Sequence, residues 1–503
     1  MASVYGASPL ADAYNLAYLF TGNILILFGG LGGPFHSATV TTLTPRKNNP
    51  EAGLLITQVM FVSGVLLTLA ALVICLIAPF LVHLIAPNYA LDNPQVHSQF
   101  TKQTILQLRI MSPLITIACL IGITYGILNV FNRLFWPSVS PMFASIAIII
   151  SLYLFPDRTS SWPLAVGTLI GALGQLCAQL PGMFKCNLRY KLSLKPAAGL
   201  KDYLSILWPA IIGTSIGQLT IYVDSLFCFQ IHDGQGAWTA ISNANRLIQL
   251  PLGVLITAML VPILPRFTEQ ATDNKPEQVK FEFRRALSFM WFISMPITMI
   301  LLVIPTPLVQ ILYERGAWKS EATGLVVSAL VFLAPSIVIY IGRDLITRVF
   351  YAYQDSKTPY YVGMSTIGVK ALLDWYFVMQ LNMAVAGICL ATTIITFFNF
   401  ALLTILLRKK IGDLGFANLI LPVLKMLIAV SAAGLCTNFC YHLLEPLLRL
   451  QHLKLIGHMG SSAAAGGIGL LAYVGLCIAL RLDEPFMLLR RLQVFPGHKR
   501  AKP

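Results

Sequence analysis

The fold of this chain is decided by the stretch Asn243-Ala244-Asn245-Arg246-Leu247-Ile248-Gln249-Leu250-Pro251-Leu252-Gly253. It lies inside an apolar run that continues to Pro262, so it is long enough to cross a bilayer as a helix. An arginine, two asparagines, a proline and a glycine are all unfavourable in such a run. An ionisable residue inside a membrane is by default a candidate functional site. The stretch therefore predicts a broken transmembrane helix that carries a functional charge.

The same stretch has a counterpart near the start of the chain. Residues 12–34 align with residues 243–265 without a gap, which pairs Ala13 with Ala244, Gly22 with Gly253 and Pro34 with Pro265. Further along, Val130-Phe131-Asn132 resembles Val349-Phe350-Tyr351. We interpret this as one half-protein unit used twice, a design found in transporters.

The repeat suggests three parts. They are an N-terminal lobe over residues 1–202, a C-terminal lobe over residues 203–410 and, outside the repeat, two further transmembrane helices with a basic tail over residues 411–503.

The composition is that of a membrane protein. Of the 503 residues, 56% are hydrophobic and only 11% are charged, whereas a soluble domain has about 25% charged residues. Apolar runs of roughly 20 residues recur along the whole chain, each long enough to span a bilayer as a helix. We find none of the short alternating segments of a membrane barrel. The sequence therefore predicts an all-α polytopic membrane protein.

The length rule gives about 13 candidate spans. They lie near residues 10–43, 53–85, 104–132, 137–154, 163–184, 203–231, 238–264, 286–313, 322–352, 360–380, 384–407, 417–444 and 456–481.

The net charge of +15 follows the topology and does not indicate a nucleic-acid partner. Basic residues gather in the loops after the first, fifth, seventh, eleventh and last spans, the pattern that marks cytoplasmic loops and suits anionic membrane lipids. The C-terminus is therefore expected in the cytoplasm and Met1 outside. The basic residues are Arg46, Lys47, Lys185, Arg189, Lys191, Lys195, Lys201, Lys275, Lys280, Arg284, Arg285, Arg408, Lys409, Lys410, Arg490, Arg491, Lys499 and Arg500.

Nothing in the sequence indicates covalent chemistry. The nine cysteines show neither metal-ligand spacing nor a disulfide framework. Phosphate loops, nucleophile elbows and zinc-ligand motifs are also absent from the sequence. We therefore expect a transporter and not an enzyme, with no cofactor and no metal.

Four segments resemble the MurJ (MviN) lipid II flippases of the multidrug/oligosaccharidyl-lipid/polysaccharide exporter superfamily, in the order found there. The segments are Tyr5-Gly6-Ala7-Ser8-Pro9-Leu10-Ala11-Asp12-Ala13-Tyr14, the opening stretch with Val254, Leu312-Tyr313-Glu314-Arg315-Gly316-Ala317-Trp318, and Arg348-Val349-Phe350-Tyr351-Ala352-Tyr353-Gln354-Asp355-Ser356-Lys357-Thr358-Pro359. The resemblance implies 14 helices, in two six-helix lobes with two extra helices. The predicted spans match helices 2 to 14, and the family's first helix is expected to be missing before Tyr5.

The resemblance also implies a function. We expect a monomeric flippase of the bacterial plasma membrane that moves the undecaprenyl-pyrophosphate-linked peptidoglycan precursor, lipid II, by alternating access. Other cell-wall synthesis proteins are further candidate partners. The alternatives are an exporter of another polyprenyl-linked oligosaccharide or of a drug, and a membrane scaffold of the same fold that does not transport.

Arg246 is the first candidate for substrate binding. The resemblance places it in the central cavity, and a guanidinium offers a planar fork of donors to a pyrophosphate. Asn243, Asn245 and Gln249 lie on or near its helix face, where they either bind sugar and peptide groups or pack helices together. The family's usual double arginine falls on Leu25 and Ile26 here, so we expect Arg246 to carry more of the anion binding.

Two further charged positions are candidates for the cavity. Asp12 stands at the matching place of the first repeat copy, where we favour a cap on its own helix over substrate contact. Asp344 and Arg348 are four residues apart and are expected to pair, which leaves Arg343 as a free charge that either faces the cavity or lies at a helix end.

The remaining constellation consists of Asp224, Lys370, Asp374 and Thr392. The resemblance implies that some relatives hold a sodium ion among polar residues of the matching helices. Here an ammonium stands where a cation would sit, so we expect Lys370 to neutralise Asp224 and Asp374 in place of a metal. The alternative is a structural Lys370–Asp374 pair with Asp224 turned elsewhere.

Overall fold

The computed structural model describes residues 1–30, 33–47, 49, 51–155, 159–186, 188, 190, 193, 197, 199–231, 234–273, 275–448 and 454–491. Within these ranges the regular structure is entirely helical, which confirms the predicted fold class. Five residues of the basic pattern lie outside the described residues: Arg189, Lys191, Lys195, Lys499 and Arg500.

The chain forms two compact units. Unit 1 comprises Met1–Thr239 with Gly316–Trp318, and unit 2 comprises Ala240–Arg315 with Lys319–Pro503. The contacts thus divide the chain at residue 239, inside a helix, and not at the predicted lobe boundary of residue 202. The boundary between the repeat copies stays a prediction.

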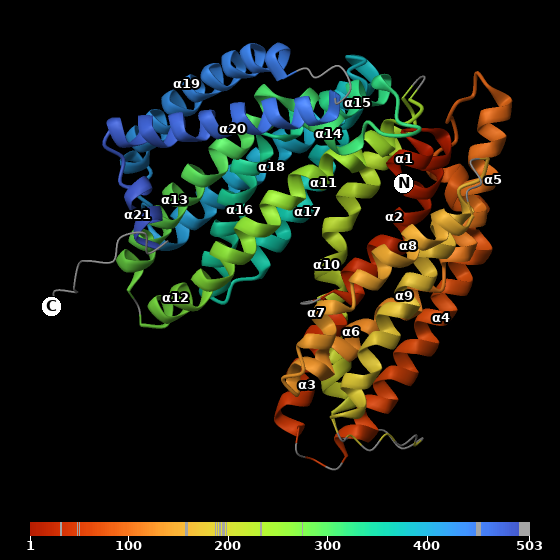
Figure 1. Ribbon diagram of the computed structural model, residues 1–503. Coiled ribbons are helices and arrows are strands. Elements are labelled where there is room, and N and C mark those ends of the chain that lie inside the picture. The colour runs from red at the N-terminus through yellow and green to blue at the C-terminus, as the bar shows by residue number, and fades with distance from the viewer. Residues whose placement is uncertain are drawn as a thin grey trace. The chain divides into compact units, whose positions relative to one another are not determined.

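Unit 1 contains ten α-helices and one short 3₁₀ turn among its described residues (Figure 1). They are α1 (Ala2–Tyr5), α2 (Pro9–Gly29), α3 (Pro34–Leu43), η1 (Thr44–Arg46), α4 (Ala52–Ile85), α5 (Pro94–Met111), α6 (Leu114–Val130), α7 (Phe135–Val139), α8 (Met142–Leu154), α9 (Trp162–Phe184) and α10 (Leu200–Cys228).

Unit 2 begins within α11 and continues through the green and blue helices of Figure 1. Its elements are α11 (Ala237–Leu255), η2 (Ile256–Leu260), α12 (Val261–Thr272), α13 (Pro276–Val303), α14 (Pro305–Tyr313), α15 (Ser320–Leu333), α16 (Ser336–Ala352), α17 (Lys357–Trp375), η3 (Tyr376–Gln380), α18 (Ala384–Ile411), α19 (Ala417–Leu448), α20 (Lys454–Ala479) and α21 (Glu484–Arg491).

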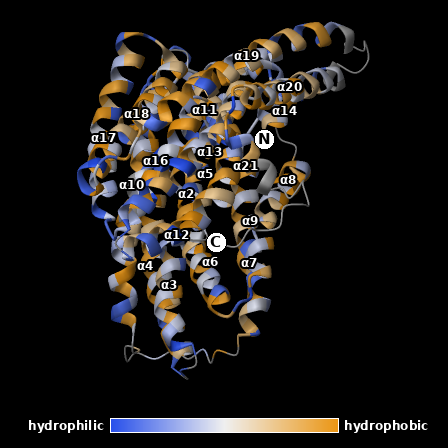
Figure 2. Ribbon diagram, turned by 90° about the vertical axis from the view of Figure 1, so that its left-hand side faces the viewer, coloured by the Kyte–Doolittle hydropathy of each residue, from blue (hydrophilic) through white to orange (hydrophobic). Residues whose placement is uncertain are grey.

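Long apolar helices dominate both units, as the hydropathy colouring of Figure 2 shows. In the described part of the chain, 11 helices are long and apolar enough to cross a membrane, or 12 if the bent pair α15–α16 forms one span. The predicted number of about 13 is therefore not confirmed. The predicted span at residues 360–380 is missing from either count, because α17 carries Lys370 and Asp374 among its apolar residues.

Local sequence signals explain where helices of unit 1 begin. Pro9 opens α2, and the Ser8 hydroxyl accepts a hydrogen bond from the Ala11 amide at 3.4 Å. Pro94 opens α5 in the same way, behind the Asn93 side chain. Proline suits the first helical position and a short polar side chain satisfies the free amides behind it, so these starts are encoded locally.

The predicted break does not interrupt the opening stretch, because α11 runs through it to Leu255. Pro251 lies inside the helix, where it removes one hydrogen-bond donor and crowds the preceding turn. A five-residue π-helical turn, η2, follows before α12 continues the span. Wider turns of this kind are frequent at functional sites.

Two helices of equal length support the internal repeat. Helices α6 and α16 each have 17 residues and begin directly after a proline. Two residues beyond the end of each helix the backbone enters the left-handed region, at Asn132 (φ 55°) and Gln354 (φ 57°). The sequence comparison paired Asn132 with Tyr351, so the structure shifts this pairing by three residues.

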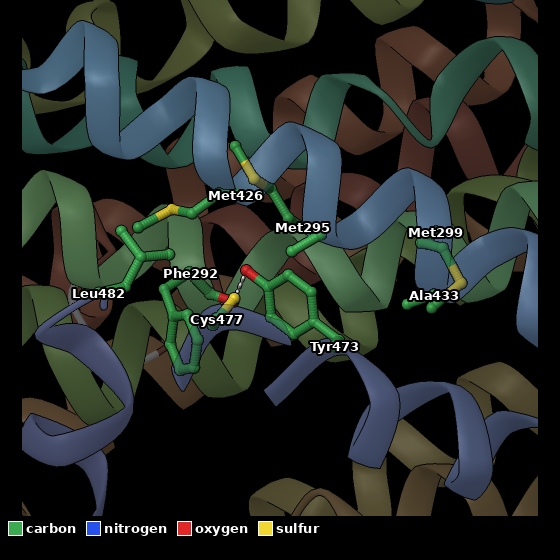
Figure 3. Close-up of a cluster of buried hydrophobic side chains, with 9 residues drawn as sticks. Phe292, Met295, Met299, Met426, Ala433, Tyr473, Cys477 and Leu482 are labelled. Carbon is green, nitrogen blue, oxygen red and sulfur yellow. Dashed lines mark hydrogen bonds between the residues drawn. The ribbon is translucent and has the colours of Figure 1, made fainter. Parts of the chain in front are cut away.

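The last two long helices belong to the core of unit 2. Helices α19 and α20 run side by side, and α19 packs on α13 (Figure 1). Figure 3 shows the cluster at this contact, where the rings of Phe292 and Tyr473 stack at 5.4 Å between centroids. The Tyr473 hydroxyl donates to the Phe292 carbonyl oxygen at 3.1 Å, so the buried phenol is satisfied.

Candidate functional site

Arg246 lies on the exposed face of α11. Gln249, Leu250, Gly253 and Val254 share this face, because residues three and four apart fall on one side of a helix. The Arg246 guanidinium donates to the Asn243 side-chain oxygen at 3.3 Å, and no described carboxylate forms an ion pair with it. A positive charge in a transmembrane helix is thus held by one neutral group.

The polar neighbours of Arg246 differ in their exposure. Asn243 is only 4% exposed, and its backbone carbonyl accepts a hydrogen bond from the Tyr313 hydroxyl at 3.3 Å. Asn243 therefore orients Arg246 from inside the protein, which fits the helix-packing alternative. Asn245 is half-buried and Gln249 is exposed, so Gln249 is the amide available beside the guanidinium.

Asp12 is fully buried and joins three segments of unit 1. Its carboxylate accepts hydrogen bonds from the Tyr89 hydroxyl at 2.8 Å, the Gly236 amide at 2.7 Å, and the amide and hydroxyl of Thr239 at 2.9 and 2.7 Å. Asn15 donates to the same threonine hydroxyl at 3.0 Å. Burial, together with the Asp12 charge, raises the pKa of Tyr89 well above its usual value, which keeps the phenol a donor.

These contacts correct both predictions for Asp12. The residue does not cap its own helix, because Ser8 holds that position. Its carboxylate reaches instead to Gly236 and Thr239 at the start of α11, where free amides attract a negative group. With 0% exposure it cannot contact a substrate in this structure.

Helix α16 carries a compact charged turn. Asp344 pairs with Arg348 at 3.9 Å, which confirms the predicted pair, and also with Arg343 at 3.6 Å. The prediction that Arg343 is a free charge is wrong. Its long side chain reaches the adjacent carboxylate and lies over the Tyr340 ring, 4.0 Å from the centroid, an arrangement that stabilises a cation.

Lys370 and Asp374 form a completely buried ion pair on α17. Their charged atoms are 2.6 Å apart, and both side chains are 0% exposed. The spacing of four residues brings the two side chains together on one helix face. This part of the predicted constellation is confirmed.

The other two predicted members, Thr392 and Asp224, lie on different helices from this pair. Thr392 lies on α18 and its hydroxyl donates to the Ile388 carbonyl of the same helix at 2.9 Å. Asp224 is half-buried on α10 in unit 1. Among the described residues no group of three or more His, Cys, Asp or Glu side chains is arranged to hold a metal. Neutralisation of Asp224 by Lys370 stays a prediction.

The partners of Asp12 were not anticipated. Tyr89 and Thr239 are 77 and 227 residues away from Asp12 in the chain, so no local pattern links them. One signal was available. Helix α11 starts after Gly236 with no acidic residue in its first turn, so its free amides call for an anion from elsewhere in the chain.

Comparison with solved structures identifies the fold. A structure titled "Inward-facing conformation of a multidrug resistance MATE family transporter of the MOP superfamily" aligns with a TM-score of 0.67 and 14% identity, over 82% of this chain and 93% of that one. A structure titled "Lipid II flippase MurJ, inward closed conformation" aligns with a TM-score of 0.74 and 22% identity, over 98% and 95% of the two chains. Helical membrane transporters of this superfamily therefore share the fold.

The sequence comparisons then identify the family. The family model described as "Lipid II flippase MurJ" matches residues 1–457. A probable lipid II flippase MurJ of Synechocystis is 30% identical over 435 residues, covering 83% of this chain and 79% of that protein. Another, from Thermotoga maritima, is 26% identical over 476 residues, covering 92% and 94%. The chain belongs to the MurJ family of lipid II flippases.

Proposed function

We propose that this protein is a lipid II flippase, which moves the undecaprenyl-pyrophosphate-linked peptidoglycan precursor across the bacterial plasma membrane. Family membership over most of the chain supports the assignment. In this scheme the C-terminus lies in the cytoplasm, as the basic loops predict. The protein binds and moves its substrate without changing a covalent bond of it.

The observation that carries the proposal is the exposed guanidinium of Arg246. A charged side chain near the middle of a transmembrane helix costs about 2.5–3.5 kcal/mol unless water or a partner meets it. Asn243 supplies only a neutral oxygen, so most of the donor fork remains available. A pyrophosphate offers oxygens to this fork in a bidentate geometry.

The polar side chains near Arg246 have supporting roles in substrate binding. Gln249 shares the exposed face of α11 with Arg246 and is placed to bind a sugar or peptide group of the same substrate. Asn243, buried behind them, keeps the guanidinium directed outward. Arg343 shares its charge with Asp344, so we propose for it at most an auxiliary contact to the anion.

Complementation of a strain depleted of its own lipid II flippase tests the proposal. The wild-type chain should restore growth, and Arg246→Ala should lower precursor flipping at least about tenfold, because a hydrogen bond to a charged group contributes about 1.5–3 kcal/mol. Arg246→Lys, which keeps the charge but loses the fork, should be intermediate.

Arg315→Ala is the matched control. Arg315 is an exposed arginine of the same unit whose guanidinium donates to the Ile311 carbonyl of its own helix turn at 3.0 Å. This variant should flip the precursor as the wild type does. Growth supported equally by Arg246→Ala, at equal membrane levels, would remove Arg246 from the mechanism. Failure of the correctly inserted wild type would overturn the flippase assignment.

A further inference from the structure

A cavity of about 310 Å³ lies within unit 2, apart from Arg246. Its walls come from η2 and α12, from the first half of α13 and from α21, three helices that lie together in Figure 1. Most of the lining residues are apolar, including Met259, Ile263, Phe289 and Met487. We call it the α12–α13–α21 cavity.

Arg266 and Arg285 line the same cavity, together with Glu282. Both arginines are exposed, and among the described residues no hydrogen bond or ion pair engages either guanidinium. Neighbouring basic residues behave differently. Lys280 pairs with Glu277 at 2.7 Å, and Arg284 donates to the Leu414 carbonyl oxygen at 3.0 Å. Arg266 and Arg285 are thus available to bind an external anion.

The wall formed by α21 is fastened in place. Glu484, in the first turn of α21, is 6% exposed and accepts a short hydrogen bond from the Ser288 hydroxyl of α13. Met487 of the same helix then lines the cavity. The cavity is therefore lined by helices that pack on one another.

The lining residues indicate which chemical class of ligand the cavity binds. Two guanidinium groups suit phosphate oxygens, which they bind through parallel hydrogen bonds. Apolar walls beside them suit the glycerol and first acyl carbons of a lipid. Basic pockets between transmembrane helices, beside a loop rich in Lys and Arg, are known sites for anionic lipid headgroups. The loop that joins α12 to α13 leads directly into Lys280, Arg284 and Arg285.

We propose that the α12–α13–α21 cavity binds the phosphate headgroup of an anionic phospholipid, with Arg266 and Arg285 as its ligands. Glu282 also lines the cavity, three residues before Arg285 on α13, and lowers the positive charge of the lining, so it limits the affinity. A lipid bound there bridges α13 and α21. The inference does not depend on flippase activity.

Native mass spectrometry of the full-length protein in a neutral detergent tests the proposal, with phosphatidylglycerol and phosphatidylcholine as probes. The wild type should bind phosphatidylglycerol in preference to phosphatidylcholine. Each cation near a headgroup changes the affinity roughly fivefold, so Arg266→Gln/Arg285→Gln should bind phosphatidylglycerol about 25-fold more weakly. Unchanged affinity in this variant overturns the proposal.

Arg315→Gln/Lys319→Gln is the matched control, since it removes two exposed positive charges of unit 2 that do not line the cavity. It should keep phosphatidylglycerol binding within about twofold of the wild type. An equal loss in this control means that overall charge, and not the cavity, attracts the lipid, and the proposal fails.

Two further arms separate folding and substrate effects. Glu282→Gln should bind phosphatidylglycerol about fivefold more tightly, a gain that a misfolded variant cannot produce, and a loss would contradict the site.

Undecaprenyl pyrophosphate carries the same phosphate chemistry. If Arg266→Gln/Arg285→Gln lowers its binding but leaves phosphatidylglycerol unaffected, the cavity belongs to the flipped lipid and the phospholipid proposal is overturned.

Discussion

Two helices of unit 2 carry charged side chains in opposite environments. On α17, Lys370 and Asp374 are both 0% exposed and 2.6 Å apart. On α11, Arg246 is exposed, and among the described residues its guanidinium is held by the neutral oxygen of Asn243 at 3.3 Å. The Lys370 charge is neutralised by Asp374 inside the protein, whereas the Arg246 charge is exposed on the surface of α11.

The difference separates structural charge from functional charge. A buried ion pair contributes little net stability, but removing one partner leaves the other as an uncompensated charge. An exposed cation stabilises nothing inside the protein, so its removal affects only what it binds. Stability and transport should therefore respond to substitutions at the two sites in opposite order.

Lys370→Met should produce the largest loss of stability. It leaves the Asp374 carboxylate buried without its ammonium, which typically costs about 3–5 kcal/mol. Thermal unfolding of the detergent-purified protein should show a strongly lowered midpoint, and the variant should reach the membrane at a reduced level. Full stability and full activity in Lys370→Met would rule out a structural role for the pair.

Lys370→Met/Asp374→Leu provides the control for this first prediction. Replacing both charges by apolar groups of similar size is often neutral, so the double variant should regain most of the lost midpoint. The hypothesis that Lys370 also neutralises Asp224 can be examined on the same background. Rescue of Lys370→Met by Asp224→Asn would support it, and no rescue would confine the cluster to α17.

Asp12→Asn should have the next largest effect. The buried carboxylate of Asp12 accepts four hydrogen bonds within unit 1, and a bond to a charged group contributes about 1.5–3 kcal/mol. Because an amide can still accept some of them, we expect a loss of about 2 kcal/mol, measured by thermal unfolding. Ser8→Ala removes the cap of the same helix and should cost about 1 kcal/mol. An Asp12→Asn loss no greater than that of Ser8→Ala would contradict the network.

An ion pair between the loop after α16 and the last turn of α18 lies between the two extremes. Lys410 and Asp355 are 2.6 Å apart, and their side chains are 34% and 20% exposed. Burial raises the pKa of Asp355, but hydrogen bonds from Lys410 and Thr358 outweigh it and hold the pKa at about 2, below the usual 3.8. This carboxylate therefore stabilises the protein above about pH 4.

Asp355→Asn should lower stability by about 1 kcal/mol at neutral pH, a figure reduced for solvent screening of a partly exposed pair. The difference from the wild type should persist down to about pH 4 and shrink as the pH falls towards 2, because the folded carboxyl then takes up its proton. Unfolding midpoints measured across this pH range provide the check. A difference that does not change with pH would show that the pair contributes nothing.

Much of the fold was predictable because its signals are local. Apolar runs, the proline at the start of α2 and the proline inside α11 lie within single segments, and so do the pairs Lys370–Asp374 and Asp344–Arg348. The predicted span count is not confirmed at α17 for a related reason, since the buried charges of Lys370 and Asp374 lower the mean hydropathy of the helix although they neutralise each other.

The remaining features depend on segments far apart in the chain. Asp12 meets the start of α11 across more than 200 residues, and the α12–α13–α21 cavity combines residues near 266, 285 and 487. Arg343 was misjudged although its partner is adjacent. Helical spacing predicts which side chains share a helix face, and adjacent residues do not. A long arginine side chain can nevertheless bend to reach the residue next to it, as Arg343 reaches Asp344.

Arg246→Ala should have the smallest effect on stability and therefore gives the sharpest contrast. Because the guanidinium is exposed and makes one hydrogen bond to a neutral group, its removal should change the free energy of unfolding by no more than about 0.5 kcal/mol. The unfolding midpoint should match that of the wild type, while precursor flipping falls as proposed above. A lowered midpoint would mean that Arg246 holds α11 in place, and its loss of transport would then be indirect. An unchanged midpoint with lost transport would show that the protein keeps this charge for its ligand, as it keeps Lys370 for Asp374.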